Sequence, residues 1–351
     1  MNSVMLVFFI LIIIMASILT IFTAKLYFST RYSPVAALMA VFMLAILGYA
    51  VWMPATWLSS SEVALASFFL DFAFLGLLPG FFFFVLFFEG IKGNYLSKLF
   101  VPFIIVFSIT FGYAVATTPW NNSFVDNMWH QTFEFEFNIL FVLLGLSVLI
   151  IVLYRLSQFI REKESGRSKK YPVIALIGWI IAIVSMFLDI PNVDTVMSFV
   201  SMSVVGIAFL KDPNSFFASN TKIKAVLIID SESFLPYIHL SFDKRTVELN
   251  LASAGLGAVM KMLQEISKAN FLPTKLEHKE TGFLIEQNTK YQVCAVIIIE
   301  QINETLRGPL QYALSSFISK FRDKLDLVNT ADVFESFETD LRRIFQFALP
   351  Q

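Results

Sequence analysis

Residues 62–90 read EVALASFFLDFAFLGLLPGFFFFVLFFEG, and between Val63 and Phe88 the only ionisable side chain is that of Asp71. A helix needs about 20 mostly apolar residues to cross a bilayer, because its backbone groups must be satisfied inside the segment. This stretch is therefore predicted to be a transmembrane helix, in which Pro79-Gly80 would permit a kink or a tilt. Seven stretches of this kind are predicted to span the membrane: 4–23, 34–53, 62–88, 99–118, 137–154, 171–190 and 194–210.

The composition agrees with a membrane protein. Of 351 residues, 57% are hydrophobic and 15% are charged, and the mean hydropathy is +0.71. An ordinary soluble domain has about 25% charged residues. The charged residues gather in the tail: residues 1–210 contain 10 Lys and Arg, whereas residues 211–351 contain 16.

The basic residues before position 211 all fall in alternate loops. They are Lys25, Arg31, Lys92, Lys98, Arg155, Arg161, Lys163, Arg167, Lys169 and Lys170. Cytoplasmic loops are enriched in Lys and Arg, so we expect a multi-pass protein of the cell membrane with its N-terminus outside and its tail in the cytoplasm. The start Met1-Asn2-Ser3 lacks the basic residues of a signal peptide, which favours an uncleaved first helix.

The predicted organisation is a seven-helix transmembrane domain (1–212), a linker (213–221) and a cytoplasmic domain (222–351). The expected elements of the tail are strands 224–230 and 235–242, a helix 251–269, and strands 274–287 and 291–300. The segment 274–287 could form two strands instead of one. Two further helices are expected, one that begins near 308 and a last one that spans 332–347. Helices on a mostly antiparallel sheet make this an α+β domain.

Asp71 is the strongest candidate for a functional side chain in the bundle. Intramembrane carboxylates are costly, so Asp71 is interpreted either as a ligand contact, proton acceptor or switch, or as a hydrogen-bonded packing residue. Asp189 and Asp194 flank the turn between the last two spans and could attract a cation or an amine. The alternative is that acidic residues are simply tolerated on the outer side.

Four aromatic residues are further candidates for lining a pocket in the bundle: Tyr49, Trp52, Tyr113 and Trp179. Packing or an interfacial position is the more common role of such residues. The alternating segment 132–137 is expected to be either an extended cap over the bundle or the start of span five. Glu89 is expected to form a surface pair with Lys92.

We find no sequence motif for catalysis. The three histidines and the single Cys294 form no metal-ligand spacing, and no phosphate-binding loop or nucleophile elbow is present. We therefore expect neither an enzyme, nor a metal, nor a cofactor. The last predicted span has no lysine before Lys211, which excludes a retinal Schiff base. A net charge of −1 gives no reason to expect nucleic-acid binding.

Two resemblances extend this interpretation. The run Leu78–Gly90 and the segment Asp194–Lys211 resemble the seven-helix region at the N-terminus of some prokaryotic histidine kinases, which implies a sensory input domain. Glu89 departs from the aromatic or small residue expected there. The element order of 222–351 resembles the longin-like group, relatives of the roadblock modules. That resemblance implies a non-catalytic domain that binds a small GTPase or signalling protein, or forms a homodimer.

The resulting hypothesis is a seven-helix sensor or receptor in the lipid bilayer, which relays a stimulus sensed in the bundle to a cytoplasmic interaction domain. Two alternatives are a transporter or channel with a regulatory tail, and a passive membrane anchor for a trafficking or GTPase-associated scaffold.

Overall fold

The structure is a computed structural model, and it describes residues 3–91, 97–125, 128–161, 170–185, 193–211, 223–242, 255, 257–259, 261–262, 274–278, 281–300, 302–325 and 333–346. The chain divides into two compact units. The first contains most of the N-terminal helices and a small hairpin, and the second contains a five-stranded sheet with its helices. An apolar helical region followed by a sheet-containing region is the arrangement that the sequence predicts.

Five helices of the first unit are long and apolar enough to cross a membrane. They lie within α1 (Ser3–Thr30), α2 (Ser33–Trp52) with the short 3₁₀ helix η1 (Met53–Trp57), α3 (Val63–Ile91), α4 (Phe100–Thr117) and α5 (Phe135–Arg161). Large apolar side chains such as Ile21, Phe68 and Phe135 are exposed on these helices. A helix bundle with an apolar outer surface indicates a multi-pass membrane protein.

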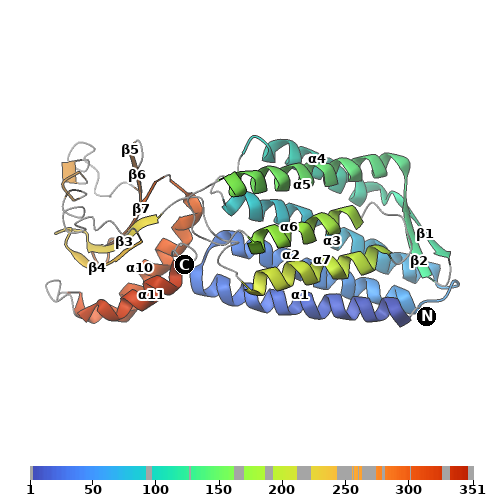
Figure 1. The fold of residues 1–351 in the computed structure, drawn as a ribbon, viewed down its shortest axis with the longest axis horizontal. Coiled ribbons are helices and arrows are strands. Elements are labelled where there is room, and N and C mark those ends of the chain that lie inside the picture. The colour runs from blue at the N-terminus through green and yellow to red at the C-terminus, as the bar shows by residue number, and fades with distance from the viewer. Residues whose placement is uncertain are drawn as a thin grey trace. The chain divides into compact units, whose positions relative to one another are not determined.

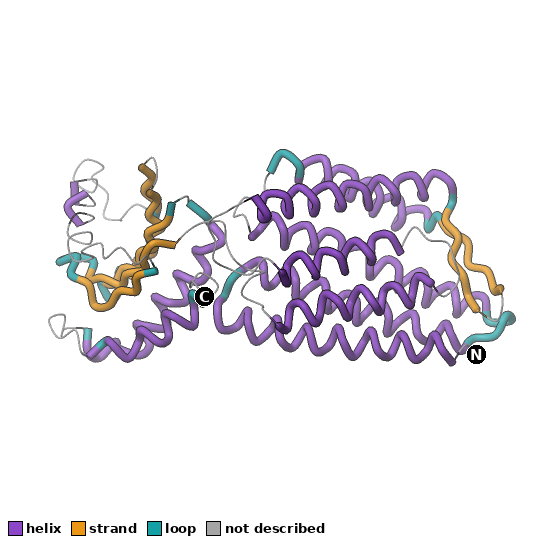
Figure 2. Tube along the Cα trace, viewed as in Figure 1, coloured by secondary structure: helices purple, strands orange, loops and turns teal. Residues whose placement is uncertain are grey.

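Two further helices of this unit contain apolar stretches that are too short, among the described residues, to count as full spans. These are α6 (Lys170–Ser185) and α7 (Val193–Lys211), whose apolar stretches in the described residues are Val173–Ala182 and Thr195–Lys211. A Cβ atom on Gly178 would lie 2.8 Å from a methyl group of Val205, so glycine is needed for this close approach of α6 to α7. Figures 1 and 2 show the seven helices side by side, with the hairpin at one end of the bundle.

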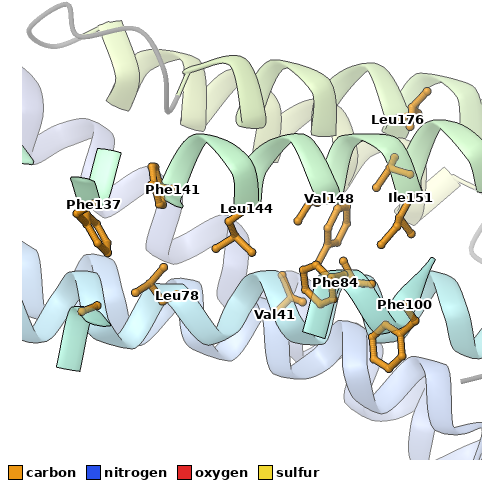
Figure 3. Packing of buried hydrophobic residues seen from close by; sticks show 14 of the residues in the cluster. Val41, Leu78, Phe84, Phe100, Phe137, Phe141, Leu144, Val148, Ile151 and Leu176 are labelled. Atoms are coloured by element: carbon orange, nitrogen blue, oxygen red, sulfur yellow. The ribbon is translucent and has the colours of Figure 1, made fainter. Parts of the chain in front are cut away.

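The core of the bundle is built around α3 and α5. Figure 3 shows Leu144 and Val148 of α5 beside Leu78 and Phe84 of α3. Helix α3 is continuous through Pro79, so the kink that the sequence permits does not interrupt the helix. Helix α2 approaches α3 at Gly48, where a Cβ atom would lie 2.4 Å from Cγ of Leu77.

A β-hairpin connects α4 to α5. It consists of β1 (Trp120–Val125) and β2 (Met128–Phe133), which pair antiparallel. Of the two alternatives for the segment 132–137, the extended one therefore holds for its first two residues, and the start of span five holds from Phe135.

The second unit contains an antiparallel sheet with the strand order β4-β3-β7-β6-β5. Its strands are β3 (Ile223–Asp230), β4 (Pro236–Ser241), β5 (Lys275–His278), β6 (Thr281–Asn288) and β7 (Val293–Ile299). All seven residues of β7 are buried, which requires cover on both faces of the sheet. The central strand and the division of 274–287 into two strands agree with the sequence prediction.

Helices cover this sheet. The helical elements that follow β7 in the chain are η2 (Glu304–Leu306), α10 (Arg307–Phe321), η3 (Arg322–Lys324), η5 (Glu335–Phe337) and α11 (Glu338–Ile344). Phe317 of α10 packs on Tyr237 of β4 with ring centroids 5.6 Å apart. The expected helix 251–269 and the expected linker 213–221 lie partly or wholly outside the described residues. Within that helix, a Cβ atom on Gly257 would lie 2.6 Å from the side chain of Phe234.

Candidate functional site

The hairpin turns a patterned face toward the bundle. Alternate residues of the two strands share this face, since successive side chains in a strand point to opposite sides. The register pairs Trp120 with Phe133, Asn122 with Gln131, and Phe124 with Trp129. An amide pair is thus flanked by two aromatic pairs.

The amide pair lies against Asp71 of α3. The Asp71 Oδ1 atom accepts hydrogen bonds from Trp120 Nε1 at 2.6 Å, Asn122 Nδ2 at 2.8 Å and Gln131 Nε2 at 3.4 Å. We call these four residues the hairpin clasp. Sequence reasoning identified Asp71, but it did not identify Trp120, Asn122 and Gln131 as its partners.

Aromatic packing holds both ends of the hairpin face. Trp120 is 6% exposed and lies 5.0 Å from the ring of Phe74, one turn after Asp71 on α3. Trp129 is 8% exposed and packs with Ala55 of η1 and Leu70 of α3. The hairpin is therefore fixed to α3 on both sides of the clasp.

The clasp contains a carboxylate without a described cationic partner. The three hydrogen bonds to Asp71 all come from neutral groups and end on Oδ1, so within the described chain Oδ2 accepts none. The Oδ1 atom of Asn122 and the Nε1 atom of Trp129 are buried and find no hydrogen-bond partner among the described residues. Most buried polar atoms are paired, so these two atoms call for an explanation.

The four aromatic candidates are packed against other rings. Tyr49 stacks on Trp52 at 6.4 Å, and both rings contact Phe9. Trp52 also packs on the cluster that holds Trp129. These two residues therefore belong to the aromatic surroundings of the hairpin.

The other two aromatic candidates lie along the main core. Tyr113 stacks on Phe137 at 6.3 Å, and Phe137 in turn lies 5.7 Å from Trp120 of the clasp. Trp179 lies 4.2 Å from Phe84, farther along α3.

The acidic candidates near the last turn are not placed. Asp189 lies outside the described residues, and so does the side chain of Asp194, although its backbone belongs to α7. Neither residue can be assigned to the clasp.

Glu89 forms a buried ion pair with Arg155. Arg155 donates from Nε to Glu89 Oε1 at 2.9 Å and from Nη2 to Oε2 at 2.6 Å. The side chain of Arg155 is 9% exposed and that of Glu89 is 0% exposed. The expected surface position of Glu89 is wrong, because α5 brings Arg155 to α3 across 66 positions of sequence and the pair is buried. The expected partner, Lys92, lies outside the described residues.

At the start of α3, Glu62 is bound by Ser59. The backbone N–H and the hydroxyl of Ser59 both donate to Glu62 Oε2, at 2.8 and 2.9 Å. These bonds lower the pKa of the Glu62 carboxyl below its ordinary value. Glu62 is thereby kept as a fixed negative charge near the same end of α3 as Asp71.

Neither the protein families, nor the curated proteins, nor the solved structures that were compared contain a match to this chain. Among the described residues, no group of three His, Cys, Asp or Glu side chains could hold a metal ion. The chemistry available at the clasp is that of a carboxylate, two amides and an indole framed by aromatic rings.

Proposed function

We propose that the protein is a membrane sensor, whose hairpin end receives a stimulus and whose sheet-containing unit passes it to a partner in the cytoplasm. In this proposal α6 and α7 complete a seven-span bundle with the N-terminus outside. The one-sided distribution of Lys and Arg supports that orientation.

The observation that carries the proposal is the hairpin clasp. A charged side chain within an apolar helix is expensive, and here it binds the connection between α4 and α5. Breaking or remaking three hydrogen bonds to one carboxylate is a change that could couple the hairpin to α3.

The core packing provides a route from the hairpin along the bundle. Helix α5 follows β2 directly and packs along α3 through Phe141, Leu144 and Val148. Close-packed cores transmit displacements because they deform little. A movement of the hairpin relative to Asp71 would therefore shift α5 against α3.

The sheet-containing unit supports a role in protein binding. Renumbered from its own start, its strand order is 2-1-5-4-3, with helices against a doubly covered central strand. This arrangement favours the longin-like interpretation, in which the unit binds a signalling protein or a small GTPase, or forms a homodimer, without catalysis.

The proposal is tested by crosslinking the full chain in its own cells and quantifying the recovered cytoplasmic proteins. Asp71→Asn is expected to change the recovered amounts relative to the native chain, whereas Glu134→Gln, an exposed charge outside the clasp, is expected to leave them unchanged. Equal recovery from all three proteins would favour a passive anchor.

A further inference from the structure

We infer that the hairpin clasp is the recognition site for a small organic cation that carries a primary ammonium group. This inference rests on the proposed function, since it names the stimulus that the sensor would receive. The site combines two groups that lack partners among the described residues. The Asp71 carboxylate has no cationic partner, and the side-chain carbonyl oxygen of Asn122 has no hydrogen-bond donor.

The charge of the site requires a cation. Asp71 is held by three neutral donors, and no Lys or Arg side chain of the described residues pairs with it. The flanking segments 53–62 and 118–136 contain no Lys or Arg, and the exposed Glu62 lies near the same end of α3. Charge of one sign around a site raises the local concentration of the opposite ion.

The free acceptors indicate a hydrogen-bond donor as the ligand. Asp71 Oδ2 accepts no bond from the described residues, and Asn122 Oδ1 is buried without a partner. The two groups are adjacent, because Asn122 Nδ2 lies 2.8 Å from Asp71 Oδ1. An ammonium group has three donors and no acceptor, which matches a site whose free groups are acceptors.

The surroundings favour an organic ammonium ion over a metal ion. Two free oxygen atoms are far fewer than the six to eight ligands of a calcium site. In contrast, the aromatic pairs Trp120–Phe133 and Phe124–Trp129 flank the amide pair in the strand register. Aromatic rings attract ammonium groups through their faces and also bind the attached carbon atoms.

Binding is tested on the full chain in lipid nanodiscs, by titrating propylammonium chloride at constant pH and ionic strength and following tryptophan fluorescence and the unfolding temperature. Tetramethylammonium, which cannot donate a hydrogen bond, and KCl are the comparison salts. We expect a saturable response to propylammonium that is weaker with both comparison salts.

Four variants locate the response. Asp71→Asn and Asn122→Ala each remove one of the proposed contacts and should weaken binding by about tenfold to a hundredfold. Thr132→Val removes an exposed hydrogen bond of the hairpin to Asn121 and leaves the clasp unchanged, and Glu134→Gln removes an exposed acidic charge; both should bind nearly as tightly as the native chain. If Asp71→Asn does not fold, Asn122→Ala carries the test.

The inference is overturned if propylammonium produces no saturable response, if tetramethylammonium or KCl reproduces it, or if Asp71→Asn and Asn122→Ala bind as the native chain does. It is also overturned if Thr132→Val loses binding equally, because that result would indicate general loosening of the hairpin. Binding without any effect on partner recovery would contradict the sensor proposal and leave the ammonium site intact. If partner recovery depends on Asp71 but propylammonium does not bind, the ammonium site is contradicted and the sensor proposal stands.

Discussion

Asp71 and Glu89 lie 18 positions apart on the continuous helix α3, and both carboxylates bind the chain segment that runs from β1 through α5. At 1.5 Å per residue they are separated by about 27 Å along the helix. Asp71 fixes the hairpin near one end, and Glu89 fixes Arg155 of α5 near the other. Helix α3 is thus tied to the same segment by polar contacts at two distant points.

Replacing Asp71 by Asn is expected to loosen the hairpin. The substitution keeps an acceptor oxygen but removes the charge that strengthens the bonds from Trp120 and Asn122. The expected loss is about 1–3 kcal/mol in the free energy of opening the hairpin. Hydrogen exchange of residues 120–133 should accelerate accordingly, and exchange equal to that of Glu134→Gln would show that the clasp contributes nothing.

Glu89→Gln is expected to destabilise the bundle by about 3–5 kcal/mol, because it removes one charge of a buried ion pair. Replacing both residues with apolar ones, as in Glu89→Leu with Arg155→Met, should recover most of that loss. The measurement is denaturant unfolding in detergent.

The matched control for this pair is Glu338→Gln, which removes an exposed partner of Arg342 four residues away on α11. Exposed ion pairs of this kind within one helix contribute only about 0.3–0.5 kcal/mol to the free energy of unfolding. Similar effects of Glu89→Gln and Glu338→Gln would contradict the buried position of the Glu89–Arg155 pair.

Cys294 is expected to be unreactive in the folded protein. Burial, with a smaller contribution from Glu286, raises the pKa of the thiol from 9.0 to about 12. Because the folded pKa is the higher one, the stabilisation associated with the neutral thiol is complete below pH 9 and is lost as the pH rises toward 12. The unfolding free energy should therefore fall more steeply over this range in the native chain than in Cys294→Ala.

Maleimide labelling gives an independent measure of the same prediction. Labelling of Cys294 should follow unfolding of the sheet, since its side chain is buried in β7. Rapid labelling of the native protein below pH 9 would refute this assignment.

The buried Cys294 also permits a test of orientation, because it leaves little labelling background. Asn121 and Lys290 are both exposed, the first on the hairpin and the second in the turn before β7. In intact cells an impermeant maleimide should label Asn121→Cys, and it should label Lys290→Cys only after permeabilisation. The opposite pattern, or labelling of both in intact cells, would be incompatible with the proposed orientation.

The sequence predicts most of the secondary structure because the apolar signal is local. Each of the five spans corresponds to a long run of mostly apolar residues in the sequence, and the buried strands β3 and β7 correspond to short apolar runs. The hairpin was missed because each of its strands has only six residues within a longer polar loop. Its signal was the alternation Trp120, Asn122, Phe124 followed by Trp129, Gln131, Phe133.

The partners of the two bundle carboxylates could not be predicted in the same way. Asp71 meets residues 49 to 60 positions away, and Glu89 meets Arg155, 66 positions away. Such contacts depend on how helices pack, which a single sequence does not specify. Sequence reasoning could identify the costly charges, and only the fold supplied what compensates for them.

The central claim is that the hairpin clasp communicates with the sheet-containing unit. The most direct measurement is hydrogen exchange across the full chain in nanodiscs, comparing the native protein, Asp71→Asn and Glu134→Gln. The account predicts that Asp71→Asn alone changes exchange both in residues 120–133 and in residues 223–242, beyond the end of α7. A change confined to the hairpin, with residues 223–242 unaffected, would contradict it.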